Sequence, residues 1–142
     1  MIGDESALPA ITAALTDLTD DAVVRVIVTV DSAAHEPELK LGHQGQVVFI
    51  HRSAGNGESA EAAVRALEWL PGRVDAFVHG EAHEVMHGIR PYLFKVRGVP
   101  KGQVSISGYW RKGRSEESFR EWKSELAAVE GDGRGGGRKG DR

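Results

Sequence analysis

The stretch G-D-E-S-A-L-P-A-I, residues 3–11, predicts how the chain begins to fold. Gly3 suits a tight turn at a strand end, because glycine accepts backbone angles that other residues adopt only at a cost. Ser6 is placed to cap a helix with its hydroxyl, and Pro9 then falls in the first turn, where its missing N–H costs nothing. The stretch therefore predicts a strand end, a turn and a helix start, where open α/β sheets bind nucleotides, although a plain helix cap gives the same pattern.

Four further apolar runs predict strands, with helical patterns between them. The run 22–30 (A-V-V-R-V-I-V-T-V) is apolar on both sides, which is typical of a parallel sheet covered on both faces. Pro91 predicts a kink or a break in the helix that contains it. The alternation predicts an α/β fold, a three-layer open parallel sheet. The other expected strands are 46–50, which reads as buried, 74–78 and 104–110, and the expected helices are 8–18, 58–70, 81–97 and one capped by Ser115.

The first strand of this predicted sheet is largely missing. Only Met1 and Ile2 precede Gly3, and in a doubly wound sheet the first strand is the central one. Buried backbone groups left unpaired beside it would cost on the order of 1–3 kcal/mol each. Three arrangements stay open: the chain is a piece of a longer protein, a second chain fills the gap, as in a homodimer, or the strand order changes.

Composition limits the class of protein. The 142 residues are 40% hydrophobic, which predicts one α/β domain over residues 1–130. Residues 131–142 are rich in Gly and Arg and have no apolar residue, so we expect them to be disordered. A net charge of -3 argues against nucleic-acid binding, and no apolar run is long enough for a membrane span. The absence of cysteine and of an export signal predicts a cytoplasmic protein without disulfides.

Three segments resemble the siderophore-interacting protein family. They are residues 3–11, H-G-E-A at 79–82 and S-G-Y-W-R-K-G-R at 107–114, and their order and spacing match over roughly residues 1–125. The resemblance is to the C-terminal NAD(P)H-binding domain of FAD-dependent ferric-siderophore reductases, which have a ferredoxin-reductase-like fold. It implies hydride transfer from NADPH or NADH to FAD, and electron transfer to a ferric siderophore for iron release. The family's flavin-binding barrel has no counterpart in this sequence, so FAD would be held by a partner domain or chain.

The resemblance also assigns residues to the nicotinamide at two strand ends. The absence of a side chain on Gly80 would let the cofactor approach closely, and N–H groups of the first helix would face it. Tyr109 and Trp110 would stack near the flavin and nicotinamide rings, although they would serve equally as core residues. The residues expected to border the nicotinamide are Asp4, Glu5, Ser6 and Ala7 at the first strand end and Gly80, Glu81 and Ala82 at the second.

Other residues in the resemblance are suited to anionic groups. Arg52 and Ser53 could hold an adenosine 2'-phosphate, since Arg offers a fork of donors and Ser a hydroxyl, which favours NADPH. Asp31 could instead bind a ribose hydroxyl, which favours NADH, so the choice stays open. A basic cluster suits an anionic siderophore, although charges near a helix start are usually solvated. It consists of Arg111, Lys112 and Arg114.

The segment 83–87 (H-E-V-M-H) fits the H-E-x-x-H pattern of zinc peptidases. On a helix the pattern would place His83 and His87 one turn apart, with Glu84 as general base. The two histidines lie well away from the apolar stripe of the predicted helix, so plain exposure explains them too. With no third histidine at a suitable spacing, we expect no metal site. A zinc hydrolase is therefore the weaker alternative, behind a non-catalytic remnant or binding module of the reductase fold, and no catalytic residue is assigned.

Overall fold

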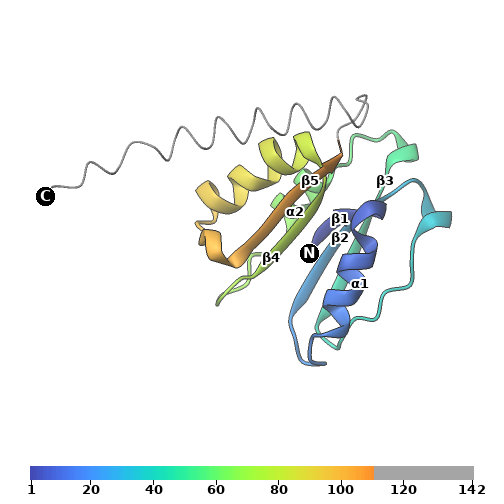
Figure 1. Ribbon diagram of the computed structural model, residues 1–142. Helices are drawn as coiled ribbons and strands as arrows, with labels where there is room; N and C mark the ends of the chain where they lie inside the picture. The colour runs from blue at the N-terminus through green and yellow to red at the C-terminus, as the bar shows by residue number, and fades with distance from the viewer. Residues whose placement is uncertain (111–142) are drawn as a thin grey trace, which may run out of the picture. The chain divides into compact units, whose positions relative to one another are not determined.

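A five-stranded sheet with the order β3-β2-β1-β4-β5 organises residues 1–110, which the computed structural model describes (Figure 1). The pairings of β2 with β3, β1 with β2 and β1 with β4 are parallel. Along β5, contacts with β4 advance in step from Ser105 beside His79 to Gly108 beside Ala82, as parallel neighbours require. The strands are β1 (Ile2–Asp4), β2 (Val24–Val30), β3 (Gly45–His51), β4 (Ala76–Glu81) and β5 (Val104–Trp110). The predicted parallel α/β fold is confirmed.

Helices cover both faces of the sheet. Figure 1 shows α1 (Leu8–Thr16) on one face, and α2 (Ala60–Ala66) with a second helical run on the other. This run, residues 82–96, is called the wide helix here, because Glu84–Ile89 and Tyr92–Val96 form π-helical turns. Short 3-10 turns complete the described structure at Glu5–Ala7, Ala33–His35, Arg52–Ala54 and Lys101–Gln103. The predicted helix that begins at Ser115 and the tail 131–142 lie outside the described residues.

Each face of the sheet carries its own hydrophobic core. Alternate residues of β2 point to opposite faces, which explains why the run 22–30 is apolar on both sides. The core under α1 contains Ala7, Ile11, Leu15, Val26, Val28 and Val30. The core under α2 and the wide helix contains Ile2, Ile27, Ile50, Ala60, Val64, Val78, Val85, Ile89, Tyr92 and Leu93.

The first strand is short and central, so the strand order is not rearranged. β1 pairs with β2 over Ile2 to Asp4 and with β4 at Ile2 and Gly3. The amino group of Met1 donates to Arg25 O at 2.8 Å, and Ile27 N donates to Met1 O at 2.9 Å. These two hydrogen bonds extend the pairing of β1 with β2 to Met1, the residue before β1.

The start of the first helix differs from the prediction. Ser6 was expected to be the cap, but Asp4 is the N-cap of the 3-10 turn, and its carboxylate accepts a hydrogen bond from Ser6 N at 2.9 Å. Asp4 is suited to this role because it ends β1 with the extended backbone (φ -123°) that a cap residue needs. Pro9 lies in the first turn of α1, as predicted.

Gly3 is needed for close packing and not for unusual backbone angles. It lies within β1 and is not among the described glycines with positive φ. A Cβ on Gly3 would lie 2.6 Å from Ala7 Cβ and 3.0 Å from His79 O. The glycine therefore lets the start of the helical segment sit directly against β1 and β4.

Three further predictions were wrong in detail. The strand expected to be buried, β3, is an edge of the sheet, and of its residues only Ile50 is buried. The second helix ends at Ala66 and not at residue 70, because Leu67 turns the chain into an extended conformation (ψ 136°). The break expected at Pro91 is absent, because the Pro91 backbone stays helical (φ -61°, ψ -35°) between the two π-helical turns, whereas the alternative of a kink stays a prediction.

Candidate functional site

The carboxyl ends of β1 and β4 meet at the point where the chain changes direction across the sheet. From β1 the chain passes through α1 to β2 on one side, whereas from β3 it passes through α2 to β4 on the other. In open α/β sheets, loops that diverge in this way leave a crevice beyond the strand ends, where ligands bind. We call the corresponding place here, beyond the carboxyl ends of β1 and β4, the crevice. Gly3 pairs with His79, so Asp4 and Gly80 lie side by side. The two predicted strand ends are thus brought together.

Carboxylates at both strand ends fix the starts of the helices that follow. Asp4 is buried, with 4% of its surface exposed, and it accepts hydrogen bonds from the backbone and the hydroxyl of Ser6. Glu81 accepts backbone hydrogen bonds from His83 at 3.0 Å and Glu84 at 2.8 Å. These two acids therefore orient the rim of the crevice. Two other predicted site residues, Ala7 and Ala82, are fully buried and expose no surface to a ligand.

Two glycines lie at the two strand ends, Gly3 and Gly80. Close packing requires a glycine at position 3 but not at position 80. A Cβ built on Gly80 would lie 3.5 Å from Asp4 Oδ2 and 3.7 Å from Val85 Cγ2, which are ordinary contacts. Its backbone does not have positive φ either. The absent side chain therefore leaves a methyl-sized space beside Asp4, at a residue that is itself buried, and neither packing nor backbone geometry explains this glycine.

Arg52 forms a bidentate ion pair with Glu5 across the rim. Arg52 Nη1 donates to Glu5 Oε1 at 2.7 Å, and Nη2 donates to Oε2 at 2.5 Å. These hydrogen bonds lower the pKa of Glu5 and raise the pKa of Arg52, with smaller contributions to the latter from Asp4 and Asp31. Ser53 N donates to Asp31 O at 3.0 Å, which ties the end of β2 to the turn after β3. The guanidinium that was predicted to hold a phosphate is therefore paired with Glu5.

Sequence reasoning missed an aromatic pair next to this edge. His79 stacks on Phe77, with ring centroids 4.0 Å apart and an interplanar angle of 15°, and its Nε2 lies 3.2 Å from Ser105 Oγ. Partial burial lowers the pKa of His79. The sequence did carry a signal for this pair: Phe77 and His79 are two positions apart in a strand, so their side chains lie on the same face of β4. A neutral imidazole thus lies one residue before the space at Gly80.

The H-E-x-x-H segment has a structural role in the described chain. The rings of His83 and His87 lie on the surface with centroids 4.8 Å apart. Glu84 Oε1 accepts a hydrogen bond from Glu61 N at 3.0 Å, in the first turn of α2. Within residues 1–110, no three His, Asp or Glu side chains are grouped so that they could hold a metal ion. Glu84 therefore links the wide helix to the start of α2, where a carboxylate is stabilised by the helix dipole.

We expect the replacement of Glu84 by alanine to lower the free energy of unfolding by about 1 kcal/mol, because Glu61 N loses its acceptor. Glu84→Gln keeps an acceptor oxygen and should recover most of this loss. Urea unfolding of both variants, followed by circular dichroism, measures the difference. Equal destabilisation by Ala and Gln would contradict the assigned role.

The remaining predicted residues fall at or beyond the end of the described chain. β5 ends at Trp110, and the backbone of Tyr109 and Trp110 completes that strand next to β4. The predicted stacking of their rings involves side chains that lie outside the described part. The predicted basic cluster, Arg111, Lys112 and Arg114, also lies outside it.

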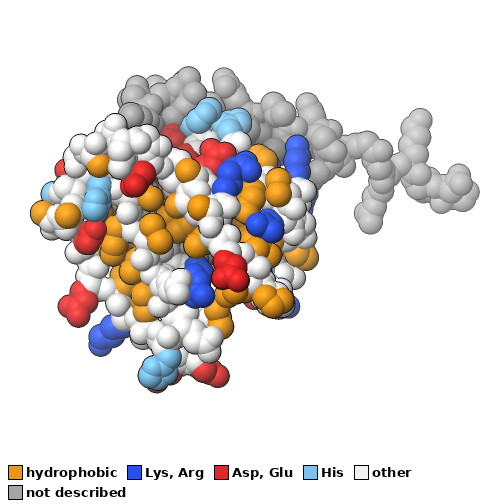
Figure 2. All heavy atoms as spheres, turned by 180° about the vertical axis from the view of Figure 1, so that it is seen from behind, with side chains coloured by type: hydrophobic (Ala, Val, Ile, Leu, Met, Phe, Trp, Pro, Cys, Tyr) orange, Lys and Arg blue, Asp and Glu red, His pale blue; other side chains and the backbone are white. Residues whose placement is uncertain are grey.

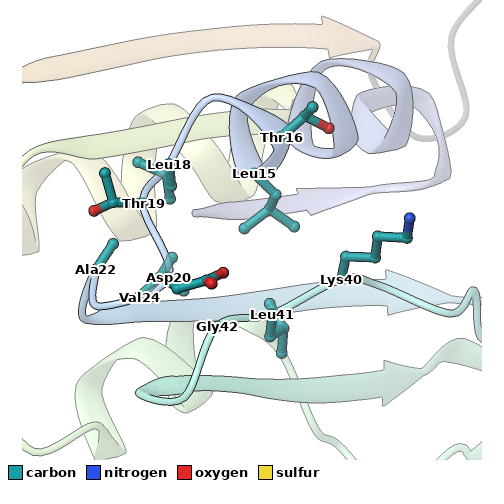
Figure 3. Close-up of a pocket in the computed structure, with 10 residues that line it drawn as sticks. All are labelled: Leu15, Thr16, Leu18, Thr19, Asp20, Ala22, Val24, Lys40, Leu41 and Gly42. Carbon is teal, nitrogen blue, oxygen red and sulfur yellow. The ribbon is translucent and has the colours of Figure 1, made fainter.

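A cavity of about 270 Å³ lies far from this edge, at the C-terminal end of α1 (Figure 3). Leu15 extends from α1 toward β2, and Lys40 and Leu41 close the other side. Because α1 begins at the carboxyl edge and ends at Thr16, the cavity belongs to the opposite end of the sheet. It is therefore separate from the crevice.

In the described chain, no helix is long and apolar enough to cross a bilayer.

Two sequence relatives match most of this chain. The chain is 45% identical over 141 residues to an uncharacterized protein of Mycobacterium tuberculosis, covering 92% of this chain and 50% of that protein. It is 29% identical over 126 residues to the ferric vibriobactin reductase ViuB of Vibrio cholerae, covering 85% of this chain and 45% of the reductase. The chain thus spans about half the length of the curated relatives it matches.

Solved structures show the same fold. The siderophore-interacting protein SipS from Aeromonas hydrophila superposes with a TM-score of 0.79 at 22% identity, covering 90% of this chain and 51% of that structure. A siderophore utilization protein from T. fusca gives a TM-score of 0.68 at 34% identity, and the match covers 80% of this chain and 44% of that structure. The family model described as "Siderophore-interacting protein" matches residues 1–113. The chain belongs to the siderophore-interacting protein family.

Proposed function

We propose that this chain is the NAD(P)H-binding domain of a cytoplasmic ferric-siderophore reductase. Family membership and the relative named as a ferric vibriobactin reductase support this class of reaction. The observation that carries the nucleotide-binding role is the space at Gly80 beside Asp4, at the switch point between β1 and β4. When bound there, the nicotinamide supplies a hydride to FAD on a partner domain or chain, and the electrons then reduce the ferric siderophore and release iron.

The described residues fit a dinucleotide in several ways. The carboxyl edge offers a glycine without a structural reason, two helix starts and the ribose-binding candidate Asp31 at the end of β2. Asp4 and Glu81 hold the two rim loops by accepting hydrogen bonds from the N–H groups of Ser6, His83 and Glu84, so a phosphate would have to use other N–H groups of these loops. The proposed ligand therefore lies across β1 and β4, with its adenosine end toward β2 and β3.

Titration of the chain with NADH and with NADPH tests this proposal. We expect saturable binding, seen as a change in nicotinamide fluorescence, and NMR shifts centred on the amides of Ser6, Gly80 and Glu81. Absence of binding, or shifts centred on the cavity around Leu15 and Lys40, would refute it. Addition of a flavin domain from a relative, a ferric siderophore and an Fe(II) chelator then separates a reductase domain from a binding module, since only the former produces Fe(II).

The Glu5–Arg52 ion pair should set the choice between the two nucleotides. Glu5 occupies the guanidinium fork that an adenosine 2'-phosphate would use, and it adds a negative charge near that position. We therefore expect Glu5→Gln to strengthen NADPH binding about 5- to 10-fold relative to NADH. Isothermal titration with both nucleotides measures this ratio.

Two controls make the result specific to Arg52. The double variant Glu5→Gln with Arg52→Gln should lose the gain, because no fork remains to hold the phosphate. Arg52→Gln alone should leave NADH binding nearly unchanged. A parallel change in the affinities of both nucleotides would show that the pair acts on rim stability and not on nucleotide choice.

A further inference from the structure

Charge is strongly segregated along the sequence. Residues 85–115 contain no Asp or Glu but hold seven Lys or Arg side chains. All 21 acidic residues therefore lie elsewhere, with 11 basic ones (18 minus 7), so the rest of the chain has a net charge of -10 (11 minus 21). Four of the seven lie in the part of the chain that the structure describes, namely Arg90, Lys95, Arg97 and Lys101.

Arg97 from this stretch and Arg65 from α2 lie over neighbouring aromatic rings. The ring of Tyr92 is buried, and two guanidinium groups lie over it. The Cζ atom of Arg65 is 4.8 Å from the ring centroid and that of Arg97 is 5.6 Å from it. Arg97 also lies 5.0 Å from the ring centroid of Trp69, and Trp69 meets Tyr92 edge to face at 6.3 Å. We call these four residues, with Val96, the arginine-aromatic patch.

The patch is held in place and keeps its charge available. Arg97 Nε donates to the hydroxyl of Tyr92 at 2.8 Å, which fixes the guanidinium without neutralising it. Among the described residues, no carboxylate lies within ion-pair distance of Arg97 or of its neighbour Lys95. Arg65 forms an ion pair with Glu61 on the same helix, with 3.3 Å between Arg65 Nε and Glu61 Oε1. A cation held on aromatic rings is ready to meet an anion at little cost in side-chain entropy.

An exposed apolar side chain lies beside these charges. Val96 is 63% exposed, the largest exposure among the large hydrophobic residues of the described chain. Figure 2, the rear view, shows Lys and Arg side chains set among hydrophobic ones on this side of the molecule. Arginine, tryptophan and tyrosine around an apolar centre are the residues that dominate protein–protein binding energy.

The patch is remote from the proposed nucleotide site. The wide helix begins at Ala82, next to the crevice, and Arg97 follows its last turn. The helical rise over that length is on the order of 20 Å. A partner on the patch would therefore leave the carboxyl edge open.

We propose that the arginine-aromatic patch is a docking surface for an acidic protein, with carboxylates that meet Arg65, Lys95 and Arg97 around an apolar contact on Val96. A protein partner with a compact acidic patch would contact the arginine-aromatic patch without contacting the acidic surfaces of the chain. Long polyanions and anionic membranes extend over a wider area and would meet acidic residues as well, since all of these lie outside residues 85–115. Charge complementarity thus favours a protein partner.

A Glu-rich peptide with leucines at its centre serves as the probe. We expect NMR shifts of the Trp69 indole N–H and the Arg97 Nε–H on titration, and an affinity that falls as NaCl is raised. Arg97→Gln should weaken peptide binding at least about 5-fold, and Arg97→Lys should recover part of the loss. Arg73→Gln is the matched control, because it removes the same charge from an exposed arginine paired with Asp75, outside the patch.

Thermal unfolding and NADH titration of each variant separate docking from folding and from the nucleotide site. The proposal is supported if Arg97→Gln loses peptide affinity with an unchanged NADH affinity and melting temperature. It is overturned if Arg73→Gln weakens the peptide equally, or if the shifts fall outside the patch. Tighter binding of duplex DNA or of phosphatidylglycerol vesicles than of the peptide, with the same sensitivity to Arg97, would overturn it in favour of those classes of ligand.

Discussion

Gly3→Ala is expected to destabilise the fold by about 2–3 kcal/mol, which would lower the melting temperature by about 10 °C. The added methyl would lie 2.6 Å from Ala7 Cβ and 3.0 Å from both His79 O and Ile11 Cδ1. Two of these atoms belong to the helical segment and one to the backbone of β4, so relief requires that α1 move away from the sheet. Thermal unfolding followed by far-UV circular dichroism measures the change.

Gly102→Ala is the control for this variant. Nothing lies within 4 Å of a Cβ at Gly102, and its backbone does not have positive φ. This change should therefore alter stability by less than about 0.5 kcal/mol. If Gly3→Ala were as mild as Gly102→Ala, the close packing of the helical segment on β1 would be wrong.

Gly80→Ala is expected to weaken NAD(P)H binding at least about tenfold while the fold stays intact. The protein around Gly80 accepts a methyl group at ordinary contact distances, and alanine in a strand is no less stable than glycine. The same methyl would fill the space proposed for the nicotinamide. Nucleotide titration together with urea unfolding separates these two effects.

The two measurements on Gly80→Ala have distinct meanings. An intact fold with unchanged affinity would show that the nucleotide does not approach Gly80, and the proposed placement would fail. A loss of stability comparable to that of Gly3→Ala would show that Gly80 serves packing. The coordinates give a packing reason for Gly3 and none for Gly80, a difference that the sequence does not show.

The central part of the fold could be predicted because its signals are local. The β-branched run that forms β2 shows its double-sided burial directly, and Pro9 marks the first turn of α1. The edge position of β3 could not be seen, since Q-V-V-F-I is as apolar as a central strand. The end of α2 at Ala66 depends on tertiary packing, because Leu67 and Trp69 leave the helix and pack against the core.

The candidate site was predictable as a set of strand ends but not as a set of contacts. The family resemblance, together with two predicted strands, placed Asp4 and Gly80 at neighbouring strand ends, where the structure has them. The Glu5–Arg52 ion pair joins residues 47 positions apart, and neither residue indicates the other in the sequence. Ser6 and Asp4 are both good caps, so the choice between them depended on where β1 ends.

The wide helix has a consequence for how the chain length can vary. Its π-helical turns bond residue i to residue i+5, where an α-helix would bond i to i+4, so each such turn holds one surplus residue. Deletion of a single residue from either turn can be absorbed by tightening to α-helical winding, with β4 and β5 still in register. Homologous chains should therefore tolerate one-residue gaps here more readily than within any strand of the sheet.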